Sequence, residues 1–178
     1  MRALALALLL AAPLDAQPGD PVERLATALT LSADQADLVA EVFDPADPAS
    51  TWTLAAELVP TLSAEQRAAL MARPERRERP AGAGAGGRPR GPRGRGDRTP
   101  DPARAAVMRA ARDAALGLDA DASARLDAVL ADLDRRETMQ ALREGDLPDP
   151  IAAVLTDAQG ELYLAHLALS RRLRAGRR

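Results

Sequence analysis

The chain has 178 residues, of which 47% are hydrophobic and only 2% are aromatic, and its formal net charge is -2. It contains no Cys and one His, and all 24 of its basic residues are Arg, so it lacks thiol nucleophiles, disulfides and the clustered donors of a zinc site. A core poor in aromatic and β-branched residues favours packed helices over a sandwich or barrel. We therefore predict an all-α protein that is not an enzyme and that has no cofactor and no specific metal site.

Residues 1–16, MRALALALLLAAPLDA, carry one Arg, then an apolar run, then a small residue. This pattern predicts a signal peptide cleaved after Ala16, or alternatively after Ala12. The run is too short to span a bilayer, and neither a second apolar stretch nor a Cys for lipid attachment follows. We expect a periplasmic or secreted protein.

Residues 74–102 are rich in Gly, Pro and Arg, a composition that opposes both helix and strand. The window 73–104 holds ten Arg and four acidic residues, a net charge of +6, so the remainder of the sequence sums to -8. We predict a flexible basic linker between two helical halves, 17–73 and 103–178. We expect either a solvated spacer, which can also loop back onto the acidic body, or a nonspecific contact for an anionic polymer.

Apolar periodicity and capping residues predict about seven short helices. Each half has fewer than about 80 residues, a size at which an isolated core is marginal, so we expect the halves to pack together or the protein to form a homodimer. The expected helices cover 33–43, 50–59, 64–73, 102–116, 120–144, a brief turn at 149–150, and 157–175.

One motif recurs three times, as TLSADQ, TLSAEQ and VLTDAQ. Its Ser or Thr and its Gln have the spacing of a capping box, in which these two side chains cap one helix start reciprocally. The preceding Leu stands where a hydrophobic staple would pack. Capping accounts for each motif as the start of a helix. It does not account for the use of Gln in all three, because Glu would cap similarly. The motif residues are Leu31, Ser32 and Gln35; Leu62, Ser63 and Gln66; and Leu155, Thr156 and Gln159.

A fourth copy is degenerate. Residues 116–130, LGLDADASARLDAVL, align without gaps on residues 29–43, LTLSADQADLVAEVF. Asp119 can still cap its helix, but Ala122 stands where the other copies have Gln. Two pairs of motifs flanking a linker indicate an internal duplication.

These motifs resemble the bacterial periplasmic LTxxQ family typified by Spy and CpxP. The resemblance implies an all-α hairpin fold, often a cradle-shaped dimer, that acts in envelope stress. Some family members are ATP-independent chaperones, others restrain a sensor kinase, and some bind zinc or other metals. Here two motifs have Ser where the family prefers Thr, and the linker interrupts the middle of the sequence.

The leading functional hypothesis is a periplasmic chaperone that binds unfolded or aggregating polypeptide. The alternatives are a regulatory adaptor that docks on an envelope stress-sensing kinase, a metal-stress sensor, and a tether to anionic polymer through the linker. His166 shares a helix face with Leu162, Leu169 and Leu173, so we predict a packing or boundary residue and not a metal ligand.

Overall fold

The computed structural model describes residues 20–72, 101–134, 138, 140–141 and 145–174. The predicted signal peptide, and all but the last two residues of the predicted linker, lie outside these ranges. Within them the protein is helical and contains no strand, which confirms the all-α class. The helices are α1 (Pro21–Leu29), α2 (Ala33–Val42), α3 (Ser50–Leu58), the 3-10 helix η1 (Val59–Thr61), α4 (Ala64–Met71), α5 (Pro102–Leu116), α6 (Ala120–Asp132), α8 (Asp149–Ala152) and α9 (Asp157–Arg174).

Helix α1 is an element that the sequence analysis did not predict. It begins as α5 does, with an Asp N-cap followed by Pro at the first helical position. The Asp20 carboxylate accepts a hydrogen bond from the Val22 N–H at 3.0 Å, and Asp101 accepts one from the Ala103 N–H at 3.0 Å. Because Pro has no N–H and a helical φ, both starts use the same local chemistry.

The prediction of one continuous helix over 120–144 is wrong. Helix α6 ends at Asp132, and Leu133 is extended, with φ -68° and ψ 135°. Apolar periodicity continues through Leu133, because its side chain still packs into the core, but the backbone leaves the helix to place it there. A new turn then begins, in which the Thr138 N–H and hydroxyl both donate to the Asp134 carbonyl, at 3.0 and 2.8 Å.

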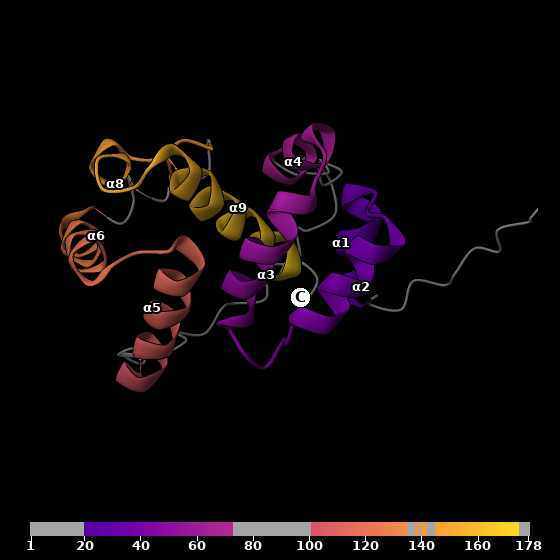
Figure 1. The fold of residues 1–178 in the computed structure, drawn as a ribbon, viewed down its shortest axis with the longest axis horizontal. Helices are drawn as coiled ribbons and strands as arrows, with labels where there is room; N and C mark the ends of the chain where they lie inside the picture. Colours follow the sequence, from indigo (N-terminus) through magenta and orange to yellow (C-terminus); the bar gives the residue numbers. More distant parts are fainter. Residues whose placement is uncertain (1–19, 73–100, 135–137, 139, 142–144, 175–178) are drawn as a thin grey trace, which may run out of the picture.

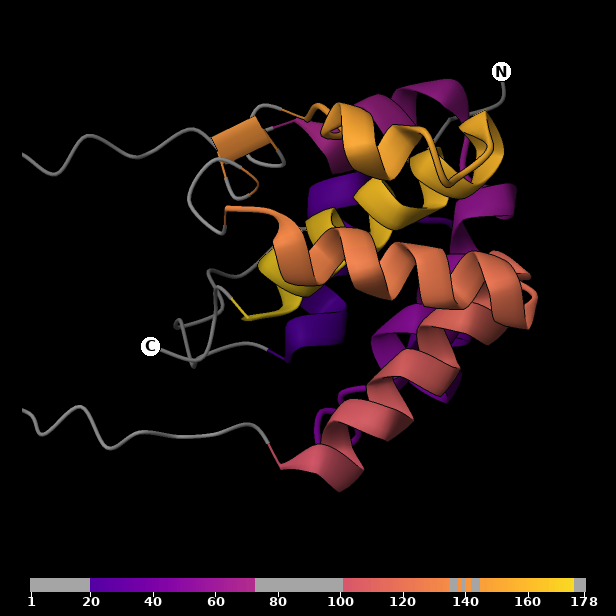
Figure 2. The same cartoon turned by 90° about the vertical axis from the view of Figure 1, so that its left-hand side faces the viewer.

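Helix α9 is the element around which the fold is arranged. It runs from the group formed by α5, α6 and α8 to the group formed by α1, α2 and α4, with α3 packed alongside it (Figure 1). The view at right angles shows α5 and α6 on the near side, with the start of α5 directed away from the other helices (Figure 2). The two halves expected from the sequence therefore pack against each other through α3, α5 and α9.

Two clusters of buried side chains form the core. The first joins α1, α2, α3, η1 and α4 to the second part of α9: Leu25, Leu29, Val39, Leu54, Ala55, Leu58, Val59, Leu62, Leu70, Ala165, Ala168, Leu169 and Leu173. The second joins α3 to α5, α8, α6 and the first part of α9: Trp52, Leu116, Leu126, Ile151, Leu155 and Tyr163. Aliphatic residues dominate both, as the composition predicts, and the half-buried Leu162 packs against both.

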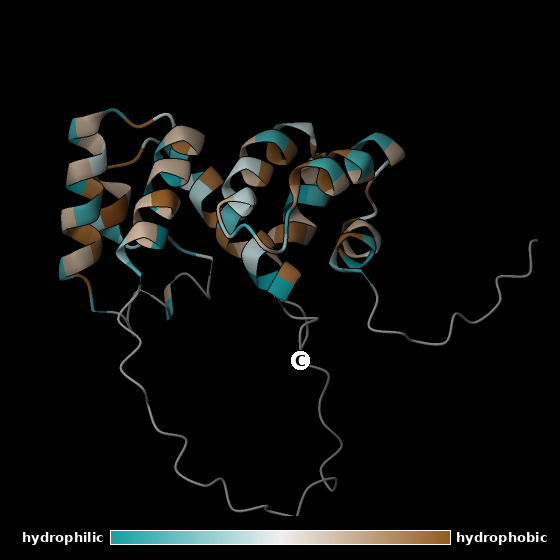
Figure 3. Cartoon of the chain, turned by 90° about the horizontal axis from the view of Figure 1, so that it is seen from below, coloured by the Kyte–Doolittle hydropathy of each residue, from teal (hydrophilic) through white to brown (hydrophobic). Residues whose placement is uncertain are grey.

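Apolar residues (brown) alternate with polar ones (teal) around each helix, so the apolar faces can turn inward (Figure 3). Among the described residues the only large hydrophobic one classed as exposed is Val107, at 53%. It lies on the first turns of α5, where residues 101–107 are all exposed. None of the described helices combines the length and apolar character that crossing a membrane requires.

The last turn of α4 is capped by a residue of α9. The Arg172 guanidinium donates to three carbonyls there, those of Ala69, Leu70 (3.3 Å) and Ala72 (3.1 Å). A cation at this end also complements the helix dipole. Burial, together with the neighbouring Arg171, lowers the pKa of Arg172 below its ordinary value. Helix α9 thereby fixes the end of α4, far away in the sequence.

Candidate functional site

All three predicted capping boxes are present. The Gln35 N–H donates to the Ser32 hydroxyl at 3.3 Å, and the Ser32 N–H donates to the Gln35 side-chain oxygen at 3.0 Å. The same reciprocal pair joins Ser63 to Gln66, at 3.1 and 2.9 Å, and Thr156 to Gln159, at 3.3 and 2.9 Å. Each motif is therefore the start of a helix, at α2, α4 and α9.

The first two motifs are also bound to each other. The Gln35 Nε2 donates to the Thr61 carbonyl at 2.8 Å, and the Gln66 Nε2 donates to the Thr30 carbonyl at 3.0 Å. The two amides face one another, with Gln66 Nε2 2.9 Å from Gln35 Oε1 and Gln35 Nε2 3.3 Å from Gln66 Oε1. Each oxygen thus caps its own helix while each nitrogen holds the other motif.

This exchange explains why the motif uses Gln. A Glu carboxylate accepts hydrogen bonds as the amide oxygen does, and it could cap its own helix, but it has no N–H to donate to the opposite carbonyl. Two carboxylates facing each other would also repel. Helix capping alone leaves the choice between Gln and Glu open, and the contact between motifs decides it.

The third motif makes a related contact in the C-terminal half. The Gln159 Nε2 donates to the Leu116 carbonyl at 2.8 Å, at the end of α5. Asp119 caps α6 through the Ala122 N–H at 2.7 Å, as predicted. Ala122 has no side-chain amide with which to return such a hydrogen bond.

The turns that precede the first motif and the degenerate one have the same geometry. Thr30 and Gly117 both have a left-handed backbone, with φ 51° and 61°. In each turn the N–H of the following residue donates to the carbonyl five residues before it, at 2.9 Å: Leu31 to Ala26, and Leu118 to Asp113. The alignment of 29–43 with 116–130 places these two residues at corresponding positions. Left-handed backbone favours Gly, so Thr30 is held in a strained conformation that directs its carbonyl to Gln66.

The motif leucines are core residues. Leu62 is 4% exposed in the first cluster and Leu155 is 7% exposed in the second, while Leu31 is half-buried against the first. Each Leu therefore ties its capped helix start to the core, as a hydrophobic staple does. The remaining motif side chains lie at the surface or are half-buried.

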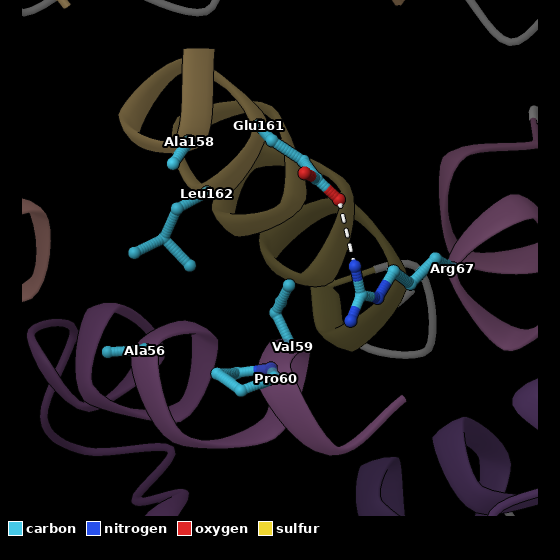
Figure 4. A pocket seen from close by; sticks show the side chains of 7 residues that line it. All are labelled: Ala56, Val59, Pro60, Arg67, Ala158, Glu161 and Leu162. Atoms are coloured by element: carbon cyan, nitrogen blue, oxygen red, sulfur yellow. Dashed lines mark hydrogen bonds and ion pairs between the residues drawn. The ribbon is translucent and has the colours of Figure 1, made fainter. Parts of the chain in front are cut away.

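A pocket of about 200 Å³ lies beside the second and third motifs, between the α3–η1 segment and the first turns of α9 (Figure 4). Arg67 and Glu161 stand at its edge, with Arg67 Nη1 3.5 Å from Glu161 Oε1 and side chains 42% and 56% exposed. Arg67 directly follows the capping Gln66, and its Nε donates to the Leu62 carbonyl at 3.2 Å. The other lining residues are Ala56, Val59, Pro60, Ala158 and Leu162.

Arg112 is the one buried guanidinium among the described residues, at 7% exposure, and it holds α5 to α6. It donates to Asp113 at 2.8 and 2.6 Å, to Asp127 at 2.8 Å and to Ser123 at 3.2 Å, and Arg109 pairs with the other Asp127 oxygen at 2.7 Å. Burial would lower the pKa of Arg112, but its hydrogen bonds to Asp127 and Asp113 raise that pKa above its ordinary value. The network balances its charges and serves packing.

His166 is 6% exposed and stacks on Trp52, with ring centroids 3.5 Å apart and planes 3° apart. Burial lowers the pKa of His166 to about 4; a hydrogen bond with the Thr51 backbone opposes this shift and Arg174 adds to it. The Tyr163 ring also contacts the Trp52 indole, with ring centroids 5.7 Å apart and planes tilted by 57°, and burial raises the pKa of Tyr163. His166 is therefore a packing residue at the junction of the halves, as predicted.

Within the described ranges no three His, Cys, Asp or Glu side chains gather closely enough to hold a metal ion. Sequence reasoning missed Arg67 and Glu161 as partners, because they are 94 residues apart and belong to different helices. Their only local signal is their place in the turn that follows a motif. Comparison with protein-family models, with curated proteins and with solved structures finds no significant match to this sequence.

Proposed function

We propose that the protein is a non-enzymatic, chaperone-like binder of unfolded polypeptide that acts without ATP in the bacterial envelope. The observation that carries the proposal is the amide exchange between Gln35 and Gln66. It supports the resemblance to LTxxQ proteins, because the repeated residues form one paired unit, and two motifs per domain are what that family has. The proposal also rests on the predicted export of the protein.

The described surface is suited to contacts with polypeptide of mixed composition. Residues 20–72 contain nine acidic and two basic residues, so this described range has a net charge of -7. Charge of one sign keeps a binder soluble while it holds an apolar client. Half-buried apolar residues such as Met71, Met108 and Leu164 border the two clusters.

An aggregation assay tests this function. The full mature protein, in molar excess and without ATP, is added to a chemically reduced or heat-treated client, and light scattering follows aggregation. We expect scattering to fall in proportion to the amount of protein added. An unrelated helical protein of similar net charge is the control. Unchanged light scattering at a tenfold molar excess of the protein over the client would contradict the chaperone proposal.

A regulatory adaptor for an envelope stress sensor is the second candidate. It is favoured by the small apolar surface, since Val107 is the only large hydrophobic residue classed as exposed in the described ranges. Broad client binding needs accessible apolar area, whereas docking on one partner uses a small matched surface. Under this alternative, client aggregation is unaffected and deleting the gene induces a stress response constitutively.

A further inference from the structure

The pocket between η1 and α9 has the size of a site for one side chain. Its volume of about 200 Å³ lies below the roughly 300–1,000 Å³ of sites that enclose drug-sized ligands. Its walls are aliphatic, formed by Ala56, Val59, Pro60, Ala158 and Leu162, and contain no aromatic ring. Figure 4 shows the Leu162 side chain extending from α9 toward α3 and the Val59 side chain extending from η1 toward α9. A compact aliphatic group therefore fits better than a planar ring or a charged group.

The edge of the pocket offers one donor and one acceptor side by side. The 3.5 Å separation of Arg67 and Glu161 is longer than the roughly 2.7–2.9 Å of a strong charge-assisted hydrogen bond. Both side chains are about half exposed, so water weakens their attraction, and exchanging partners costs little. Because the charges cancel, this edge favours neither an anion nor a cation. It matches the N–H and C=O of a peptide backbone.

The pocket is also held in shape before any ligand arrives. The Leu62 carbonyl fixes the Arg67 guanidinium, and the capping box of Thr156 and Gln159 fixes the start of α9. Val59 is 7% exposed and is anchored in the first cluster. A preformed site loses less conformational entropy on binding, so more of the contact energy remains as affinity.

We infer that this pocket receives one aliphatic side chain of an extended polypeptide, whose backbone carbonyl and N–H groups hydrogen-bond to Arg67 and Glu161. The inference rests on the proposed polypeptide-binding function and assigns that binding to the pocket between η1 and α9. The charged pair orients the backbone, and the aliphatic wall selects Leu, Val or Ile over polar residues. Clients would be held at single aliphatic residues and not through a broad apolar face.

The test compares two variants that introduce the same side chain. Ala158→Phe fills the pocket, and Ala68→Phe places the same ring on the exposed face of α4, outside the pocket lining. The probes are acetylated and amidated Gly/Ser octapeptides with one central Leu or Asn and a fluorescent label. Fluorescence anisotropy with the full mature protein measures their Kd, and circular dichroism confirms that each variant is helical.

We expect the Leu peptide to bind the wild type and Ala68→Phe at least tenfold more tightly than the Asn peptide, and Ala158→Phe to lose this preference. Arg67→Met and Glu161→Gln should each raise the Kd of the Leu peptide a few-fold and leave the preference for the Leu peptide over the Asn peptide intact. Equal binding of Leu and Asn peptides to the wild type, or unchanged binding by Ala158→Phe, overturns the inference.

The same variants separate this inference from the proposed function. If the wild type and Ala158→Phe suppress client aggregation equally, clients are not held at this pocket and the chaperone function stands. If the wild type leaves aggregation unchanged, the chaperone function fails, and the peptide titration still decides whether the pocket binds an aliphatic side chain.

Discussion

The imidazole of His166 lies flat against the indole of Trp52, and this stack joins α9 to α3 at the junction of the two halves. Because burial lowers the pKa of His166 to about 4, the folded protein holds the ring neutral at pH values where the unfolded protein already binds a proton. The stability contributed by the neutral ring is complete above about pH 6.5, the ordinary His value. It is lost progressively as the pH falls toward 4.

We therefore expect His166→Phe, which retains a flat ring, to remove this part of the pH dependence. Relative to the variant, the wild type should lose about 2 to 3 kcal/mol of unfolding free energy between pH 7 and pH 4.5. Urea denaturation followed by the fluorescence of Trp52, the only Trp in the sequence, measures it. Tyr163→Phe is the control and should follow the wild type. Parallel pH curves for wild type and His166→Phe would contradict the prediction.

The paired glutamines predict a specific effect of Gln35→Glu. The carboxylate can still accept from the Ser32 N–H, but it cannot donate to the Thr61 carbonyl, so the variant should lose about 1 kcal/mol. Adding Gln66→Glu should cost more than the sum of the single changes, because two carboxylates then face each other. Glu65→Gln, at an exposed position of α4, should change stability by less than about 0.5 kcal/mol. Thermal unfolding measures the three losses of stability. If the loss in the double variant equals the sum of the losses in the two single variants, the amide exchange is contradicted.

Thr30→Gly should stabilise the protein although it removes a side chain. Thr30 adopts a left-handed backbone that costs a residue with a Cβ about 1 to 2 kcal/mol, and the corresponding turn already has Gly117. We expect a gain of about 0.5 to 1 kcal/mol, the relief being partly offset by the entropy of Gly in the unfolded state. Thr61→Gly is the matched control; it removes the hydroxyl hydrogen bond to the Leu58 carbonyl and should destabilise. A loss of stability in Thr30→Gly, measured by calorimetry, would refute this account of the turn.

The buried guanidinium predicts a larger loss. Arg112→Met leaves Asp113 and Asp127 without their main partner, and breaking such a network costs about 3 to 5 kcal/mol when it is fully buried. Both carboxylates are partly exposed here, so we expect about 2 to 3 kcal/mol. Arg125→Met, on the exposed face of α6, should have an effect near zero. Similar unfolding midpoints for the two variants would show that the network contributes nothing to stability.

Where helices begin was predictable because capping is local. Ser32, Ser63 and Thr156 each lie within three residues of the groups they cap, so spacing alone identified them. The start of α1 carries the same Asp-Pro signal as α5 and could have been found in the same way. The end of α6 could not, because an apolar Leu133 continues the helical pattern while its backbone is already extended.

The contacts that define the candidate site depend on the tertiary fold. Gln35 meets Gln66 only because α2 and α4 start side by side, and no local pattern encodes that approach. The same holds for Trp52 on His166 and for Arg67 beside Glu161. The repeated use of Gln in place of Glu was the sequence signal of the contact between Gln35 and Gln66, but only the structure shows which residues are in contact.

The position of α9 has a consequence for the order in which the protein can fold during synthesis. Residues from both clusters lie on this helix, and Arg172 completes the end of α4. While only the first hundred residues have left the ribosome, Leu54, Leu58 and Leu70 have no α9 surface to pack against. The core of the N-terminal half is therefore completed only after residues 157–174 have been translated and α9 can pack against it.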